Sequence, residues 1–250
     1  YYNYVNKTKR NIVLTELVNH DGRYEINFDQ LEELAKDPKT KIMLLCSPHN
    51  PVGRAWTKEE LERIGRICID NGVMIAVDEI HSDLVYAPHK HIPFAAISEE
   101  FAQHSIICTS PSKTFNLAGL LVSDIIIPSD SIRAAFREKM EPYYLWPGNF
   151  GSVAQIAAYN ESEDWLEELL VYLKGNAEFL AEFLAQRMPR VKYQIPEATY
   201  LACLDFRALG LSNEERWDLM IHHAKASTAT GATFALPGTG DRPPPPPFAR

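Results

Sequence analysis

Short, almost wholly apolar segments alternate with an amphipathic segment along the first half of the chain. The apolar runs at 41–46, 73–77 and 105–108 have the length and composition of strands that are buried on both faces of a parallel sheet. Between the first two, the segment 57–72 begins with a capping-box pattern, repeats apolar residues at helical spacing and ends in Asn-Gly. This alternation of strand, helix and strand predicts an α/β fold with a mainly parallel sheet.

The flanking segments carry weaker patterns of the same kind. Residues 11–18 predict a strand, with a turn and a short return strand at 23–26. Asn27 is in position to cap a helix that runs to about Lys36, with Gln30 three residues on in a capping-box arrangement. A further apolar run, 120–127, follows Lys113 and predicts another buried strand.

The pattern changes after about residue 140, where helical stretches replace the strand and helix alternation. A long helix is expected over 163–188, with an apolar stripe that predicts core packing, followed by two strands and a helix. We therefore expect a large domain at 1–140, a smaller α+β domain at 141–237, and a Pro-rich tail at 238–250 that contains five consecutive prolines.

Composition narrows the class of protein. With 250 residues, 46% of them hydrophobic, the chain can bury a substantial core. Its net charge of −8 argues against a nucleic-acid surface, and the absence of a signal segment or a membrane-length apolar run predicts a cytoplasmic protein with no membrane partner. The four cysteines are widely spaced in apolar surroundings, which favours buried free thiols over disulfides or a metal site.

Three polar residues follow three of the predicted strands. Asn50 and Asp78 are 28 residues apart (78 − 50), and Asp78 and Lys113 are 35 apart (113 − 78). Each interval is about the length of one βαβ unit, roughly 30 residues. The three side chains should therefore meet at the carboxyl edge of the sheet, where open α/β sheets bind their ligands.

Lys113 is the centre of this candidate site. A lysine between two apolar runs is desolvated, which lowers its pKa and lets it form an imine with an aldehyde near neutral pH. The alternative is a surface lysine in a loop after a strand. An amine, a carboxylate and an amide at one edge match the needs of pyridoxal phosphate, which requires an imine partner, a carboxylate at its pyridine nitrogen and a donor at its phenolic oxygen. By contrast, the proline-bounded loop with His89-Lys90-His91 favours a solvated turn over a metal pair.

Three motifs in order carry a family resemblance. Ser47–Arg54 (SPHNPVGR), Val77–Asp83 (VDEIHSD) and Ser110–Asn116 (SPSKTFN) resemble the fold type I enzymes of aminotransferase class I/II. More narrowly, the combination is similar to the cystathionine β-lyase / cysteine-S-conjugate β-lyase branch. Further likeness at 149–151, 165–166 and 196–200 extends the resemblance from residue 1 to about 235.

The resemblance implies a role for each site residue. Lys113 would hold pyridoxal phosphate as an imine and then move the α-proton of the substrate, while Asp78 would pair with the pyridine nitrogen and Asn50 with the phenolic oxygen. His81 stands where many aminotransferases have a tyrosine. Ser110 and Ser112 would hold the phosphate. The simpler alternatives are that Asp78 is a helix cap, Asn50 a turn former and His81 a satisfied loop histidine.

The resemblance also sets expectations for the whole protein. It implies a partial three-layer large domain of the PLP-dependent transferase type, a homodimer and a small amino-acid substrate. The chain is expected to be a fragment without the N-terminal part of its relatives, and Arg242 is a weak candidate for the arginine that grips the substrate carboxylate. The expected activity is C–S β-elimination; the alternatives are an aminotransferase and a catalytically silent fragment.

Overall fold

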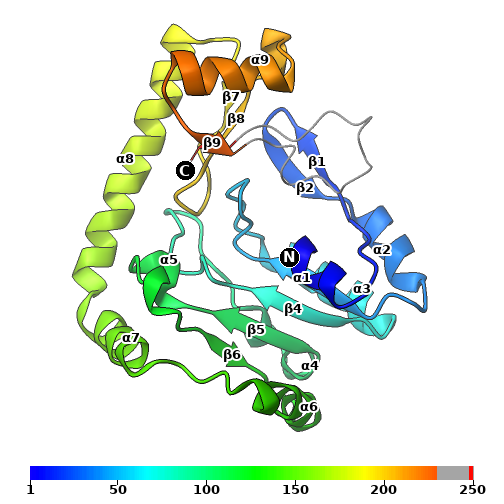
Figure 1. Ribbon diagram of the computed structural model, residues 1–250. Helices are drawn as coiled ribbons and strands as arrows, with labels where there is room; N and C mark the ends of the chain where they lie inside the picture. The colour runs from blue at the N-terminus through cyan, green and yellow to red at the C-terminus, as the bar shows by residue number, and fades with distance from the viewer. Residues whose placement is uncertain (230–247, 250) are drawn as a thin grey trace.

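The computed structural model of the protein describes residues 1–229 and 248–249, with the backbone alone at residues 2–4, 229 and 248–249. Its main sheet has the strand order β3-β4-β5-β6 (Figure 1). Strands β3 (Ile42–Cys46), β4 (Met74–Asp78) and β5 (Ser105–Thr109) are parallel, and β6 (Asp124–Ile126) is antiparallel to β5. The prediction of an α/β fold with a mainly parallel sheet is confirmed.

Helix α3 (Lys58–Asp70) forms where the pattern predicts it. Both bonds of its capping box are present, between Thr57 and Glu60, and the helix ends at Asn71. Its apolar face is fully buried, and the core of the large domain lies between this helix, the sheet and the aromatic pair Phe94 and Phe101, whose rings stack at 5.2 Å. The side chains of this core include Leu61, Ile64, Cys68, Ile75 and Val77.

The N-terminal segment is less regular than predicted. The expected strand over 11–18 is reduced to β1 (Leu17–His20), which pairs with β2 (Arg23–Ile26) in a two-stranded hairpin. Helix α2 (Phe28–Lys36) is capped by Asn27, but Gln30 completes no capping box because its side-chain oxygen accepts the Glu16 amide instead. That contact ties the chain before β1 to α2 without a strand. A short helix, α1 (Tyr2–Lys7), precedes this segment.

The run after Lys113 is also different from the prediction. A buried strand was expected over 120–127, yet only Asp124–Ile126 is extended, and Ile126 is 50% exposed. Leu121 adopts a left-handed backbone with φ 52°, which interrupts the apolar run before it can pair. Strand β6 then lies at the sheet edge with one neighbour.

A second, antiparallel sheet and a long helix form the rest of the molecule. Helix α8 (Glu163–Arg187) runs from the main sheet to the second sheet (Figure 1). Its apolar stripe was predicted to be core, which is wrong for Trp165 and Phe179, because both are exposed. Near the end of the helix Leu184 is buried and packs with Val191 and Leu204. The second sheet has the order β7-β8-β10-β9, with bounds Lys192–Tyr193, Ala202–Asp205, Phe248–Ala249 and Thr228–Ala229.

Short helices complete the chain, and the domain boundaries at 140 and 237 remain predictions. Arg242 and the five prolines at 243–247 lie outside the described residues. The remaining elements are η1 (Phe94–Ala96), α4 (Glu99–Gln103), α5 (Pro111–Thr114), η2 (Ala118–Leu120), α6 (Asp130–Met140), η3 (Glu141–Tyr143), α7 (Asn149–Glu161), η4 (Arg207–Leu209), α9 (Asn213–Asp218) and the π-helical η5 (Leu219–His223).

The described residues also bear on the composition-based expectations. All four cysteines are free thiols, as predicted, but only Cys68 is buried; Cys46, Cys108 and Cys203 are half-buried. Over the same residues, no group of three or more metal-ligating side chains comes together. No helix in the described part of the chain combines the length and the apolar character needed to cross a membrane.

Candidate active site at the carboxyl edge of the sheet

The register of the parallel strands brings their last residues side by side. Cys46, Asp78 and Cys108 are direct partners across β3, β4 and β5. Beyond them, the Ser47 amide donates to the Asp78 carbonyl at 3.0 Å, and the Glu79 amide donates to the Cys108 carbonyl at 2.9 Å. The loops that carry Asn50, His81 and Lys113 therefore leave the sheet from one edge, as the spacing predicts.

His81 links the candidate residues to one another. Its side chain is buried, and its Nε2 lies 3.5 Å from Nδ2 of Asn50. Burial lowers the pKa of His81 to about 4, with the Asp78 charge opposing and the Lys113 charge assisting this shift. The imidazole is therefore neutral near pH 7, and Asn50, Asp78 and Lys113 all lie close enough to contact it or act on it.

The hydrogen bond with Asn50 fixes the tautomer of His81. The amide nitrogen of Asn50 can only donate, so Nε2 of His81 accepts and its proton is on Nδ1. Among the described residues, Nδ1 has no hydrogen-bond partner although it is buried. The ring of Tyr200 stands edge-on to the imidazole, with a centroid distance of 5.6 Å.

Asp78 presents one carboxylate oxygen to the site. Its Oδ1 accepts the Ile80 amide at 3.1 Å, which fixes the carboxylate relative to the end of β4. Its Oδ2 accepts the hydroxyl of Tyr1. One oxygen of Asp78 thus fixes the carboxylate to the backbone, and the other accepts a hydrogen bond from the Tyr1 hydroxyl.

Asn50 lies in a tight turn at the end of β3. The His49 amide donates to the Arg54 carbonyl at 2.7 Å, and the Gly53 amide donates to the His49 carbonyl at 2.8 Å. Gly53 has φ +70°, which a residue with a Cβ adopts only with strain. The turn leaves the Asn50 side chain exposed on the side of His81.

Lys113 is half-buried on the four-residue helix α5. Ser110 caps this helix by accepting the Ser112 amide at 3.1 Å, and its hydroxyl donates to the Val122 carbonyl at 2.8 Å. Ser110 has therefore used its single proton inside the protein. The phosphate-binding role expected of Ser110 and Ser112 remains a prediction, with the structure showing Ser110 as a cap.

Two acidic residues near this edge were not identified from the sequence. Thr114, directly after Lys113, donates its hydroxyl to Asp83 Oδ2 at 2.8 Å. Glu79 is buried, accepts the Phe94 amide at 2.8 Å, and has its Oε2 3.2 Å from His91 Nε2. The expectation of a solvated turn is thus wrong for His91, which is 11% exposed. For Glu79, the signal available in the sequence was a charged residue directly after the end of β4.

The fold and this edge define an α/β protein that holds polar side chains where parallel strands end, which is where such sheets bind ligands. Residues 1–240 match the family "Aminotransferase class I and II", and the chain belongs to this family. The family predicted from the three motifs is confirmed.

Several relatives are closely similar. Cystathionine beta-lyase PatB of Bacillus subtilis is 42% identical over 241 residues, which cover 96% of this chain and 62% of PatB. Protein MalY of Escherichia coli is 32% identical, over 96% of this chain and 61% of MalY. The crystal structure of cystalysin from Treponema denticola, which contains a pyridoxal 5'-phosphate cofactor, matches with a TM-score of 0.91 and 36% identity, covering 94% of this chain and 60% of that one. The chain thus spans about three fifths of the length of these relatives.

Proposed function

We propose that the protein is a pyridoxal-phosphate-dependent C–S β-lyase that acts on cystathionine or a cysteine conjugate. The observation that carries this proposal is the common edge of the sheet from which the loops with Asn50, His81 and Lys113 leave, with Asn50 3.5 Å from the buried His81. The 42% identity with a cystathionine beta-lyase supports the choice of a C–S lyase within the family.

The residues present fit this cofactor. Asp78 Oδ2 accepts a hydrogen bond from the hydroxyl of Tyr1, and a protonated pyridine nitrogen is a donor on a ring of similar size. Asn50 offers an amide donor for the phenolic oxygen, and Lys113 offers the amine. When bound, pyridoxal phosphate supplies an electron sink for the carbanion at the substrate α-carbon.

Each residue then has a defined task. Lys113 Nζ would take the α-proton of the amino acid, and the Asp78 carboxylate would pair with the pyridine nitrogen of the cofactor. Asn50 donates from Nδ2, and His81 Nε2 holds that amide in orientation because the neutral imidazole accepts from it. Ser112 is proposed to contact the phosphate, with Ser110 contributing through its cap on α5.

The reaction is balanced without an external oxidant. The Cα–H bond would break and its proton would move to Lys113, the Cβ–S bond would break, and its electron pair would leave with sulfur as a thiolate. The proton on Lys113 would then pass to that thiolate, which leaves as the thiol. The aminoacrylate that remains is hydrolysed by water to pyruvate and ammonia. The substrate is an amino acid; a homodimer and a cytoplasmic location are part of the same proposal.

The test compares lyase and aminotransferase chemistry directly. The purified protein is mixed with pyridoxal phosphate and cystathionine, and pyruvate is measured with and without an added 2-oxo acid. We expect pyruvate without the acceptor, and a loss of about 10²–10⁴-fold in Lys113→Ala, the range that proton transfer by one residue contributes. Lys90→Ala, at an exposed loop lysine, is the matched control and should retain full activity.

The alternatives give different results. An absolute requirement for the 2-oxo acid would replace the lyase by an aminotransferase. No turnover under either condition, with the cofactor unbound, would indicate a catalytically silent fragment.

A further inference from the structure

A segment from the smaller part of the molecule, residues 196–200, crosses to the carboxyl edge of the main sheet. The amides of Glu197 and Ala198 both donate to the Gly53 carbonyl, at 2.8 and 2.9 Å. The same segment also contacts the loop after His81: the Thr199 amide donates to the Leu84 carbonyl at 2.7 Å, and the Tyr86 amide donates to the Glu197 carbonyl at 2.9 Å. The 196–200 segment is thus bonded through its backbone to both loops that hold the site.

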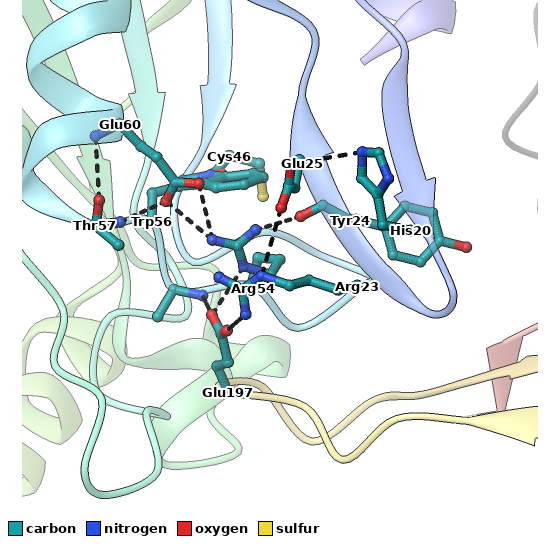
Figure 2. A network of polar contacts seen from close by, with 11 residues as sticks. His20, Arg23, Tyr24, Glu25, Cys46, Arg54, Trp56, Thr57, Glu60 and Glu197 are labelled. Carbon is teal, nitrogen blue, oxygen red and sulfur yellow. Dashed lines mark hydrogen bonds and ion pairs between the residues drawn. The ribbon is translucent and has the colours of Figure 1, made fainter.

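A buried guanidinium reinforces this junction. Arg54, which is 4% exposed, donates from Nε to Glu197 Oε2 at 3.0 Å and from its terminal nitrogen to both Glu60 oxygens at 3.0 Å. It also donates to the Tyr24 carbonyl and lies 4.8 Å from the centre of the Trp56 ring. Figure 2 shows Arg54 between Glu60 of α3, the β1–β2 hairpin and Glu197.

Glu197 is the partner that belongs to the 196–200 segment. Its side chain is 11% exposed, Oε2 also accepts the Ala55 amide at 3.0 Å, and Oε1 accepts from Arg23 at 2.9 Å. Burial raises the pKa of Glu197, but Arg54 and the Ala55 amide outweigh burial and leave that pKa below its ordinary value. Glu197 is therefore charged at neutral pH.

The position of Asn50 depends on these contacts. The Arg54 carbonyl accepts the His49 amide and so closes the turn that carries Asn50, while Gly53 receives the backbone of the 196–200 segment. The opposite loop, which carries His81, is held by Thr199 and Glu197 of that segment. The 196–200 segment thus contacts both the loop that carries Asn50 and the loop that carries His81, whose side chains lie 3.5 Å apart.

We propose that Glu197 is a positioning residue of the cofactor site, which sets the Asn50 turn against the His81 loop through Arg54 and the backbone of the 196–200 segment. This inference rests on the proposed function for the identity of the ligand. Glu197, in the smaller part of the molecule, keeps the amide of Asn50 oriented and does not itself touch the cofactor.

The first measurement needs no cofactor. Hydrogen exchange is followed by mass spectrometry in the wild type, in Glu197→Gln and in the matched control Glu60→Gln, which removes the other carboxylate from the same guanidinium. We expect Glu197→Gln to speed exchange in peptides that cover both 49–56 and 84–87. Glu60→Gln should speed exchange at the start of α3 alone, where Glu60 also closes the capping box.

The second measurement is the dissociation constant of pyridoxal phosphate, from its visible absorbance. We expect a rise of about tenfold in Glu197→Gln, which corresponds to about 1.4 kcal/mol, because the variant keeps the hydrogen bonds but loses the charge that strengthens them, and little change in Glu60→Gln. Arg54→Lys keeps the charge but loses the planar fork, so it should give a smaller rise. It also serves as the second variant if Glu197→Gln does not fold.

The outcomes separate this inference from the proposed function. A wild type that binds no cofactor contradicts the proposed function. A wild type that binds it, with Glu197→Gln and Glu60→Gln indistinguishable in affinity or in the exchange of 49–56 and 84–87, overturns the positioning role of Glu197 alone.

Discussion

The close approach at Gly53 gives the sharpest test of the packing around the site. A Cβ on Gly53 would lie 2.3 Å from Pro196 Cβ and 2.9 Å from the Ala198 carbonyl oxygen, whereas carbon atoms in contact are normally about 3.5–4.0 Å apart. Gly72 offers a matched control, since its φ of +68° is almost the same as the +70° of Gly53 and a Cβ there would meet nothing within 4 Å. Alanine at either position carries the same backbone strain, and only Gly53→Ala adds a clash.

The magnitudes follow from these two terms. A left-handed backbone costs an alanine about 1–2 kcal/mol, so Gly72→Ala should lower the free energy of unfolding by that amount. Relief of the overlap adds about 1–3 kcal/mol at Gly53, so Gly53→Ala should cost about 2–5 kcal/mol. The free energy of unfolding decreases by about 2 kcal/mol per M of urea, so the urea midpoint of Gly53→Ala should lie about 0.5–1.5 M below that of Gly72→Ala.

Urea unfolding of the two variants, followed by fluorescence, measures this difference. Because the clash falls between the Asn50 turn and the 196–200 segment, Gly53→Ala should also weaken cofactor binding, and Gly72→Ala should not. Equal urea midpoints for the two variants would refute the close packing of the 196–200 segment on Gly53.

Two further predictions concern the surroundings of the site. Burial lowers the pKa of His49 from 6.5 to about 4, so the imidazole is protonated in the unfolded chain before it is protonated in the folded protein as the pH falls. The free energy of unfolding should therefore decrease by up to about 3 kcal/mol between pH 6.5 and pH 4. In urea titrations over that range, the stability of His49→Gln should depend less on pH than that of the wild type. Thr114→Val removes the 2.8 Å hydrogen bond to Asp83, next to Lys113, and should lower kcat more than it raises KM. If the variant only reduced the amount of folded protein, kcat per folded molecule would be unchanged.

Local patterns were sufficient for much of the fold. The capping box at Thr57 and the end of α3 near Asn71 depend on contacts between residues close in the chain, and both form as predicted. The three parallel strands also form as predicted, because each short apolar run is recognisable by itself although its partners lie about one βαβ unit away. The spacing of Asn50, Asp78 and Lys113 was sufficient to predict a common edge, because parallel strands separated by one helix end on the same side.

The remaining features depend on contacts between distant parts of the chain. The ion pair of Arg54 and Glu197 joins residues 143 positions apart, and neither residue type at its position indicates a partner. The long helix shows the same limit: its stripe predicts burial, but how much of α8 meets a sheet is set by where the second sheet lies. The strand expected at 120–127 is interrupted at Leu121, because this residue has a left-handed backbone that its side chain does not predict.

The central claim is that Lys113 is the amine that captures pyridoxal phosphate beside Asn50, Asp78 and His81. The most direct measurement is reduction of the protein with borohydride in the presence of pyridoxal phosphate, followed by peptide mapping of the modified lysine. The account predicts a stoichiometric label on Lys113 that is lost in Lys113→Arg. A label spread over exposed lysines such as Lys90, with Lys113 unmodified, would contradict it.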